Sequence, residues 1–344
     1  MKKETRLKFN NLKQGIAKSY GVEDVSEKFS ATPSVEQKLM DKIQISNEFL
    51  ERINVIGVDD AEGETVLGST GPIIGSRTDT SGTGERTPKQ LLNLDGFKYK
   101  CEKADFDVAI KYKTLDQWAK FKDLNSRYMS YVKKGIASGR LIVGWNGISV
   151  APFPDATANP LGQDVNKGWL QHLREYQSGS QMLAEGGTTG EIRLGGAGDF
   201  VNLDAAVDDL KKMVGEEHRN SGDLVALIGT DLMSFDKTQL YKAQGQTPTE
   251  KERVESNAVT RTYGGLPAYN FGFFPARGLM VTSFDNLSIY FQQGSVRQHI
   301  QDRPSKDQIE HFNSFNDAYV IEDFEKAASL EFDNVRIWNG TNFS

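Results

Sequence analysis

The stretch DFDVAIKYKTLDQWAKF at residues 105–121 constrains the fold most strongly, because it joins two different periodicities. In its first half apolar side chains alternate with charged ones, which is typical of a strand with one buried face. The apolar positions of this strand are Phe106, Val108, Ile110 and Tyr112. In its second half the pattern becomes helical, and Thr114 with Gln117 forms a T-x-x-Q capping box. The sequence therefore predicts a half-exposed strand that leads directly into a helix.

The helix predicted after this strand is unusually long. Its pattern runs from Leu115 to about Val143, and GWNG at residues 144–147 ends it. At 1.5 Å per residue it is roughly 40–45 Å long, about twice the usual length in globular proteins. Charged residues, including Arg140, fall largely away from its apolar face. The apolar positions that share this broad face are Trp118, Phe121, Leu124, Tyr128, Val132, Ile136 and Val143. We expect one continuous rod.

Residues 59–104 lack enough apolar side chains to bury a core of their own. Seven glycines punctuate a stretch rich in serine and threonine, with short strand-like pieces such as ETVLG. A loop of this length without a core is usually a functional arm or disordered, and an extended two-stranded arm is marginal in isolation. If this segment is ordered, we expect it to lie on another surface.

The N-terminal residues 1–29 also differ from the rest. The first twenty carry six basic residues and one acid, and a loose helical stripe of apolar residues runs through them. A short detachable amphipathic helix and a frayed surface helix fit this spacing equally well. A second helix is expected to start at Pro33 or Ser34, and a short strand is expected at residues 53–58.

The second half of the chain mixes helical and strand-like patterns. Asn202 lies near the start of the helical stretch NLDAAVDDLKKMVGEEH, and DLVALIGTDL at 223–232 reads as a buried strand. Three strand-like pieces, centred on Val296, Val320 and Phe332, close the sequence. The expected fold class is α+β.

Composition excludes several classes of protein. The chain is 38% hydrophobic and 26% charged, which is typical of a soluble folded protein. Its net charge of −6 does not indicate strong electrostatic binding of nucleic acid. The sequence has no run of about 18 apolar residues, so no membrane span is predicted. The N-terminus has no apolar core of the kind found in secretory signals. We therefore expect the protein to fold in a cytoplasm. Cys101, the single cysteine, excludes an intrachain disulfide and is interpreted as a small buried hydrophobe.

The sequence carries no recognised catalytic or cofactor-binding motif. None of the four histidines lies in H-E-x-x-H or beside a nucleophile; His172 and His218 are interpreted as solvated, and His299 with His311 lacks a recognised metal-ligand spacing. The glycine-rich stretches have neither the Lys-Ser/Thr of a phosphate-binding loop nor the spacing of a dinucleotide fingerprint. The acidic cluster around Asp208 is interpreted as a solvated helix face. No catalytic, cofactor-binding or metal-binding residue is predicted, and the surfaces left over favour a self-assembling structural protein.

Several motifs occur in a fixed order over nearly the whole chain. They are ETRLKFN, DVSEKFSATPSVEQKLMDKIQISNEFLERINV, TDTSGTGERTPK, YKCEKADFDVAIKYKTLDQWAKFKD, GWNG, NPLGQDVNKGWLQ, GGLPAYNFGFFPARGLMVTSFDNLSIYF and NDAYVIEDFEKAASLE. In these motifs the chain resembles the major capsid proteins of tailed bacteriophages of the Peduovirus type, the temperate myovirus group.

This resemblance implies the Hong Kong 97-type capsid fold and assigns a role to each unusual segment. The implied divisions are a cleaved scaffold-like segment at 1–29, an N-arm at 30–55, an E-loop hairpin at 56–105, a peripheral domain at 106–198 with its spine helix at 115–143, an axial domain at 199–290 and returning peripheral strands at 291–344.

Two sites of maturation are expected; the resemblance implies the first, and the second is a hypothesis from the glycines of the E-loop. A phage protease is expected to cut within SEKFSATP, near Phe29 and Ser30. Gly82 and Gly84 are expected to let the E-loop bend when the shell expands. No sign of the covalent lysine–asparagine crosslinks of some such shells is present in the sequence, so cohesion would rest on interdigitation and burial.

The implied function is assembly into the icosahedral head of a virion, built in the bacterial cytoplasm. Hexamers and pentamers would close around an internal scaffold and protease and would join portal and head-completion proteins. The shell would enclose double-stranded DNA without reading its bases. No cofactor, membrane contact or enzymatic activity is expected. An encapsulin-like compartment of the same fold remains an alternative, as does an enzyme with an unusual loop. The sequence leaves open whether the coat belongs to an active phage or to a prophage remnant.

Overall fold

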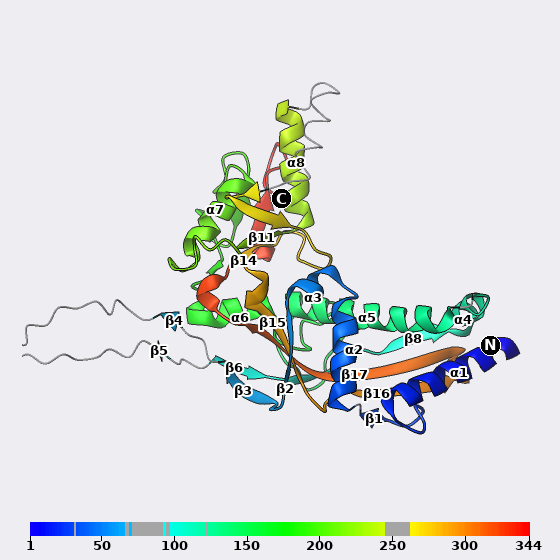
Figure 1. Cartoon of the computed structure of the whole chain (residues 1–344). Helices are drawn as coiled ribbons and strands as arrows, with labels where there is room; N and C mark the ends of the chain where they lie inside the picture. Colours follow the sequence, from blue (N-terminus) through cyan, green and yellow to red (C-terminus); the bar gives the residue numbers. More distant parts are fainter. Residues whose placement is uncertain (31, 66–68, 71–91, 94–96, 122, 245–261) are drawn as a thin grey trace, which may run out of the picture.

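The computed structural model describes the chain except residues 31, 66–68, 71–91, 94–96, 122 and 245–261, and it shows two main hydrophobic cores (Figure 1). The helices are α1 (Lys3–Tyr20), α2 (Pro33–Gln44), α3 (Glu48–Arg52), α4 (Tyr112–Trp118), α5 (Leu124–Asn146), α6 (Trp169–Glu175), α7 (Leu203–Met213) and α8 (Thr230–Gln244). In the described residues no helix is both long enough and apolar enough to cross a membrane.

A seven-stranded sheet organises the first core. Its order is β1-β16-β17-β15-β2, and β7 and β8 also pair with β17. The bounds are β1 (Phe29–Ser30), β2 (Asn54–Val58), β7 (Glu102–Asp105), β8 (Val108–Lys111), β15 (Leu287–Gln292), β16 (Arg297–Arg303) and β17 (Gln308–Ile321). β16 and β15 pair with one edge of β17, and β8 and β7 pair with the other, all antiparallel. The long strand β17 is therefore the centre of this sheet.

The strand predicted from alternation is confirmed. β7 and β8 lie on β17 in one register, with Asp105 opposite Ser314 and Val108 opposite His311, so no residue is inserted between them. The four apolar side chains of this strand all pack into the first core, because the alternation directs them to the same face.

The prediction of one continuous helix at 115–143 is wrong. The structure has α4, which begins earlier at Tyr112 and makes no use of Thr114 as a cap, and then α5 after a turn. Ala119 and Leu124 are both buried, yet five residues apart they would lie roughly 140° apart around a continuous helix. The turn between them brings both into the core and leaves Phe121, which was expected on the apolar face, 49% exposed.

The first helix is part of the core. Phe9, Leu12, Ile16 and Tyr20 of α1 are buried together with residues of α2 and α5. In Figure 1 α1 lies along the sheet near β16, with the N-terminus close to α4. The interpretation of α1 as a frayed surface helix is therefore wrong, because its apolar stripe is covered within the same chain.

A six-stranded sheet organises the second core, in the upper part of Figure 1. Its order is β12 (Thr262–Tyr263), β13 (Leu266–Tyr269), β11 (Val225–Ile228), β14 (Leu279–Thr282), β18 (Ala328–Leu330) and β9 (Met182–Leu183). α7 packs on this sheet, and the Asn202 side chain accepts a hydrogen bond from the Ala205 amide, as its position predicted. β18 and the pair β10 (Ile192–Leu194) with β19 (Val335–Ile337) also contribute to this core, although they lie outside the range 199–290 expected for the axial domain.

A hairpin leaves the body next to the first sheet (Figure 1). β3 (Glu62–Thr65) pairs with β6 (Phe97–Lys100), and farther out β4 (Ser69–Thr70) pairs with β5 (Leu92–Asn93). At its root Tyr99 packs edge-on against Tyr290 of β15, with ring centroids 5.0 Å apart. The predicted hinge residues Gly82 and Gly84 lie outside the described residues.

Candidate functional site

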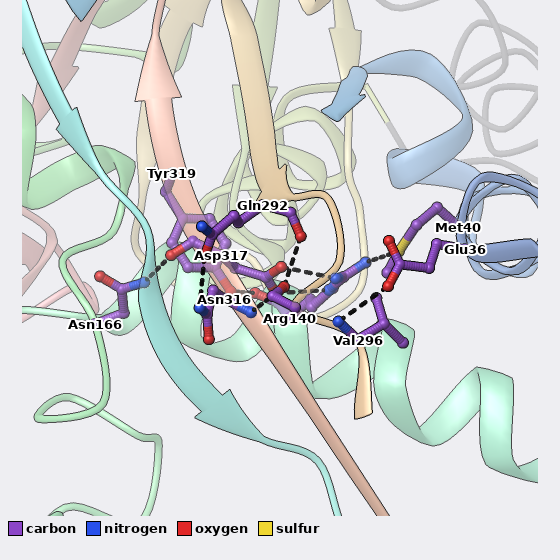
Figure 2. A network of polar contacts seen from close by, with 10 residues as sticks. Glu36, Met40, Arg140, Asn166, Gln292, Val296, Asn316, Asp317 and Tyr319 are labelled. Carbon is purple, nitrogen blue, oxygen red and sulfur yellow. Dashed lines mark hydrogen bonds and ion pairs between the residues drawn. The ribbon is translucent and has the colours of Figure 1, made fainter. Parts of the chain in front are cut away.

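Four elements that are distant in sequence meet at one polar network in the first core (Figure 2). They are α2, α5, β17 and the turn between β15 and β16. The two helices and the strand contribute side chains, and the turn contributes the backbone amides of Gly294 and Val296. Such a network can fix the relative positions of elements, because buried polar groups require specific partners.

Arg140 of α5 and Asp317 of β17 form the centre of the network. The guanidinium donates from Nε to Oδ2 and from Nη2 to Oδ1, both at 2.8 Å, and both side chains are buried. Nη1 lies 3.1 Å from the Met40 sulfur of α2. The guanidinium also stacks over the ring of Phe315, 4.7 Å from its centroid. This two-pronged geometry fixes both distance and orientation between helix and strand.

The local sequence explains this placement. Arg140 follows Ile136 by four residues and precedes Leu141, so it shares the buried side of α5 with them. Phe315, Asp317 and Tyr319 alternate along β17 and so point to one face of the strand. The Tyr319 hydroxyl donates to the Arg140 carbonyl at 2.8 Å, which joins the same two elements a second time.

The backbone around the ion pair is also bonded. The Asn166 side chain, from the segment before α6, donates to the Asp317 carbonyl at 2.8 Å. Burial raises the pKa of the Asp317 carboxyl, and the charge of Arg140 opposes that rise. The pair therefore depends on both partners remaining in place, because either charge alone would be buried without compensation.

Glu36 connects α2 to the turn between β15 and β16. Its carboxylate accepts from the Gly294 amide at 2.7 Å and from the Val296 amide at 3.2 Å, and its side chain is fully buried. Burial raises the pKa of the Glu36 carboxyl, while the two amide donors lower it. Next to this turn, the Asn316 side chain of β17 donates to the Gln292 side chain at the end of β15 at 2.8 Å. We call Glu36, Arg140 and Asp317 the clamp, because their contacts hold separate elements together. Among the residues labelled in Figure 2, none is a nucleophile next to a base.

Comparisons with known proteins identify the class of protein that carries this clamp. Residues 8–333 match the family described as phage major capsid protein, P2 family. The chain belongs to this family of capsid proteins.

Two relatives and one solved structure support the same assignment. The chain is 37% identical to the capsid protein of Escherichia phage P2 over 96% of its length and 95% of the relative's. It is 31% identical to the major capsid protein of Serratia phage KSP20, over 89% of each chain. A chain of the satellite phage P4 procapsid that includes the size determination protein superposes with a TM-score of 0.76 at 34% identity, over 98% of this chain and 99% of that one.

The family decides between the two kinds of shell that the sequence left open. The protein is a phage major capsid protein of the Hong Kong 97-like fold, a structural component of a virion, and the encapsulin-like alternative is not supported. The network of Arg140 and Asp317 therefore belongs to a shell subunit, in which it connects α2, the long helix α5 and the central strand β17.

The predicted processing residues of this capsid protein lie at the edge of the first sheet. Phe29 pairs with Gln298 of β16 and Ser30 pairs with Arg297, and these two residues make up the whole of β1. A cavity of about 410 Å³ lies alongside, lined in part by Lys28 and Arg297. β1 has only two residues to hold it at the edge of the sheet, and the Phe29 ring packs against Tyr20 of α1, with centroids 5.3 Å apart.

The histidines have structural surroundings. His311 is buried and stacks on Tyr128, with Tyr128 Oη 3.3 Å from its Nδ1, and burial lowers its pKa to about 4. His218 Nε2 lies 2.9 Å from Asp323, so the interpretation of it as merely solvated is wrong. His172 is partly buried, and burial lowers its pKa. In the part of the chain that the structure describes, no group of three or more potential ligands could hold a metal.

Cys101 is buried as predicted, and burial raises the pKa of its thiol to about 12. Sequence reasoning missed Glu36, Arg140 and Asp317, the residues that form the clamp. One signal was available for Arg140, which stands in the otherwise uncharged stretch GIASGRLIVGW. A lone charge in such a run requires a buried partner, but the sequence does not show which of many carboxylates supplies it.

Proposed function

We propose that this capsid protein assembles as hexamers and pentamers into an icosahedral head around packaged double-stranded DNA. The observation that carries this proposal is the outer part of the hairpin, where β4 pairs with β5. Among the described residues β4 and β5 pair only with each other, away from both main cores. An arm that is not packed on its own body gains stability by lying on a neighbour, so folding of the arm and assembly are coupled.

A second feature supports contacts between copies. The segment at 148–161 exposes four large apolar side chains, and Phe153 is 91% exposed. The four are Ile148, Val150, Phe153 and Leu161. Grouped exposed apolar residues on a soluble protein mark interaction surfaces, and repeated heterologous contacts of this kind close shells.

The maturation steps and partners belong to the same proposal. Residues 1–29 act as a scaffold-like segment and are cut between Phe29 and Ser30 by a phage protease, and Gly82 with Gly84 bends the E-loop on expansion. An internal scaffold, a portal and head-completion proteins share the shell, and DNA is held without base readout in a head built in the bacterial cytoplasm. The edge position of β1 and the family relationship support these steps.

Electron microscopy of the expressed chain, together with its internal scaffold, tests the proposal. We expect closed shells from the native chain and from Ala156→Ser, a control change in the exposed loop. Phe153→Ser should leave the subunit folded but lower the yield of shells several-fold, because it removes an apolar contact between copies. Native preparations that contain only soluble monomers would contradict the proposal.

A further inference from the structure

Residues 3–25 pack against α2, α4, α5 and β16, and we call the surface that they cover the α1 groove; Figure 1 shows α1 lying beside β16. The Phe9 ring meets the Tyr128 ring of α5 edge-on, with centroids 6.2 Å apart. The Ile300 amide of β16 donates to the Val25 carbonyl at 2.9 Å. The side chains that the groove buries are Phe9, Leu12, Ile16, Tyr20 and Val25. These are the contacts of a core helix.

Polar contacts fix the same segment at its N-terminal end. The Lys2 amide donates to Asp116 of α4 at 2.9 Å. Lys8 Nζ donates to the Ala119 carbonyl at 2.7 Å, one of the carbonyls left free where α4 ends. Arg6 forms an ion pair with Asp302 of β16. The contacts of α1 are therefore with residues far beyond the expected cut.

The expected cut leaves all of these contacts in place. Hydrolysis of the bond between Phe29 and Ser30 consumes one water and leaves a carboxylate on Phe29 and an amino group on Ser30. None of the contacts made by residues 3–25 uses that bond, which lies in the two-residue edge strand β1. Cutting thus removes only the tether, whose role is to keep the segment at a high effective concentration.

We propose that residues 1–29 remain bound in the α1 groove after the chain is cut, so that the groove is a binding site for a basic amphipathic helix supplied in trans. The inference rests on the proposed maturation cleavage. It makes the cleaved segment a non-covalent component of the subunit, and it keeps the Tyr128 and His311 pair covered after processing. Release of the segment then requires a conformational change of the groove in addition to proteolysis.

The test must distinguish a fragment that is held in the groove from one that is held on packaged DNA. Residues 1–29 carry seven basic and four acidic residues, and this positive balance would also hold them on DNA. We would insert the recognition sequence of a site-specific protease after Ser30 of the full chain, cut the DNA-free protein, and apply size-exclusion chromatography at high salt. Mass spectrometry should find the N-terminal fragment eluting with the remainder in equal amounts. A fragment that separates from the remainder on the column would overturn the inference.

Competition between synthetic peptides tests the groove with one and the same cut protein, because only the peptide is changed. A large excess of a labelled peptide of residues 1–29 first replaces the fragment in the cut protein, and the labelled peptide is then displaced by unlabelled native, Phe9→Ala or Leu7→Ala peptide. Phe9 is buried, whereas Leu7 on the same helix is 58% exposed. We expect the Phe9→Ala peptide to compete roughly 100-fold less well and the Leu7→Ala peptide within about 3-fold of native. Equal competition by all three peptides would show that the groove does not recognise the buried face.

The two proposals can fail separately. If the subunit from virions is cut elsewhere or remains uncut, while the fragment still co-elutes in the engineered chain, then the cleavage site is wrong and binding in the groove stands. If the virion subunit begins at Ser30 but the fragment leaves the engineered chain at once, the inference is wrong and the cleavage stands.

Discussion

Arg140 on α5 and Asp317 on β17 form a bidentate ion pair that is closed off from water on both sides. Because Met40, Phe315 and Tyr319 contact the same guanidinium or its helix, the pair fixes α2, α5 and β17 relative to one another. Burying two charges is costly, so the pair determines which arrangement forms more than it adds to stability.

Removing one partner of this pair should be far more damaging than removing an exposed pair. Asp317→Ala leaves the Arg140 charge buried alone, and we expect the free energy of unfolding to fall by about 3–5 kcal/mol. The control is Asp123→Ala, which breaks the exposed pair with Arg127 and should cost less than about 1 kcal/mol. Urea unfolding followed by tryptophan fluorescence measures both. Equal losses of unfolding free energy would show that burial does not make the Arg140–Asp317 pair more important than an exposed pair.

Glu36 should protect two backbone amides. Glu36→Ala leaves the Gly294 and Val296 amides buried without their acceptor, and we expect a loss of about 1–3 kcal/mol in unfolding free energy. Hydrogen exchange at these two amides should speed up. Glu48→Ala, on the exposed side of α3, is the matched control and should leave their exchange unchanged. Unaltered exchange in Glu36→Ala would mean that the two amides are protected without the Glu36 carboxylate.

Two glycines of α5 should respond oppositely to the same substitution. A Cβ at Gly144 would lie 2.5 Å from the Trp169 ring and 2.9 Å from the Tyr319 ring, so Gly144→Ala should destabilise the protein by about 1–3 kcal/mol. A Cβ at Gly135 would meet only Val108, at 3.4 Å. Gly135→Ala should therefore stabilise the helix by roughly 0.5–1 kcal/mol. Thermal unfolding of both variants checks the sign, and destabilisation of similar size in both would contradict it.

His311 should make the protein less stable in mild acid. Its pKa is lowered to about 4 in the folded chain and is about 6.5 when unfolded, so its neutral form contributes stability above pH 6.5. That contribution, about 3 kcal/mol, is lost as the pH falls from about 6.5 through 4. His311→Phe keeps an aromatic ring against Tyr128 and should flatten the dependence of unfolding free energy on pH in this window.

A residual slope is expected in His311→Phe, because burial lowers the pKa of His172 in the same direction. Adding His172→Phe should flatten the curve further. An unchanged slope in the double variant would mean that neither histidine accounts for sensitivity to acid in this range.

The predictable parts of this fold were those with a strong local periodicity. The alternation from Phe106 to Tyr112 gave the correct face of the strand, and four hydrophobic residues in succession marked the buried strand β11. Periodicity could not place the break between α4 and α5, since the apolar spacing changes by a single residue there. Because amphipathic spacing shows that a face is buried but not what covers it, the docking of α1 within its own chain was also out of reach.

The clamp was beyond local reasoning for a different reason. Glu36, Arg140 and Asp317 are each separated by more than a hundred residues, and only the three-dimensional fold brings them together. The resemblance of the sequence to phage capsid proteins supplied the fold class, which the structure and its relatives confirm. The position of the expected cut and the bending of the E-loop remain predictions.

The pairing of β17 has a consequence for synthesis of the protein on the ribosome. The strands β7 and β8 are made early, yet each waits for a partner roughly two hundred residues further on. Until translation has passed Ile321, their alternating apolar faces have no sheet to join and are open to capture by other nascent chains. A host that makes large amounts of this coat protein must therefore keep many incomplete chains apart. The need for chaperones arises because β17 is encoded near the 3′ end of the gene.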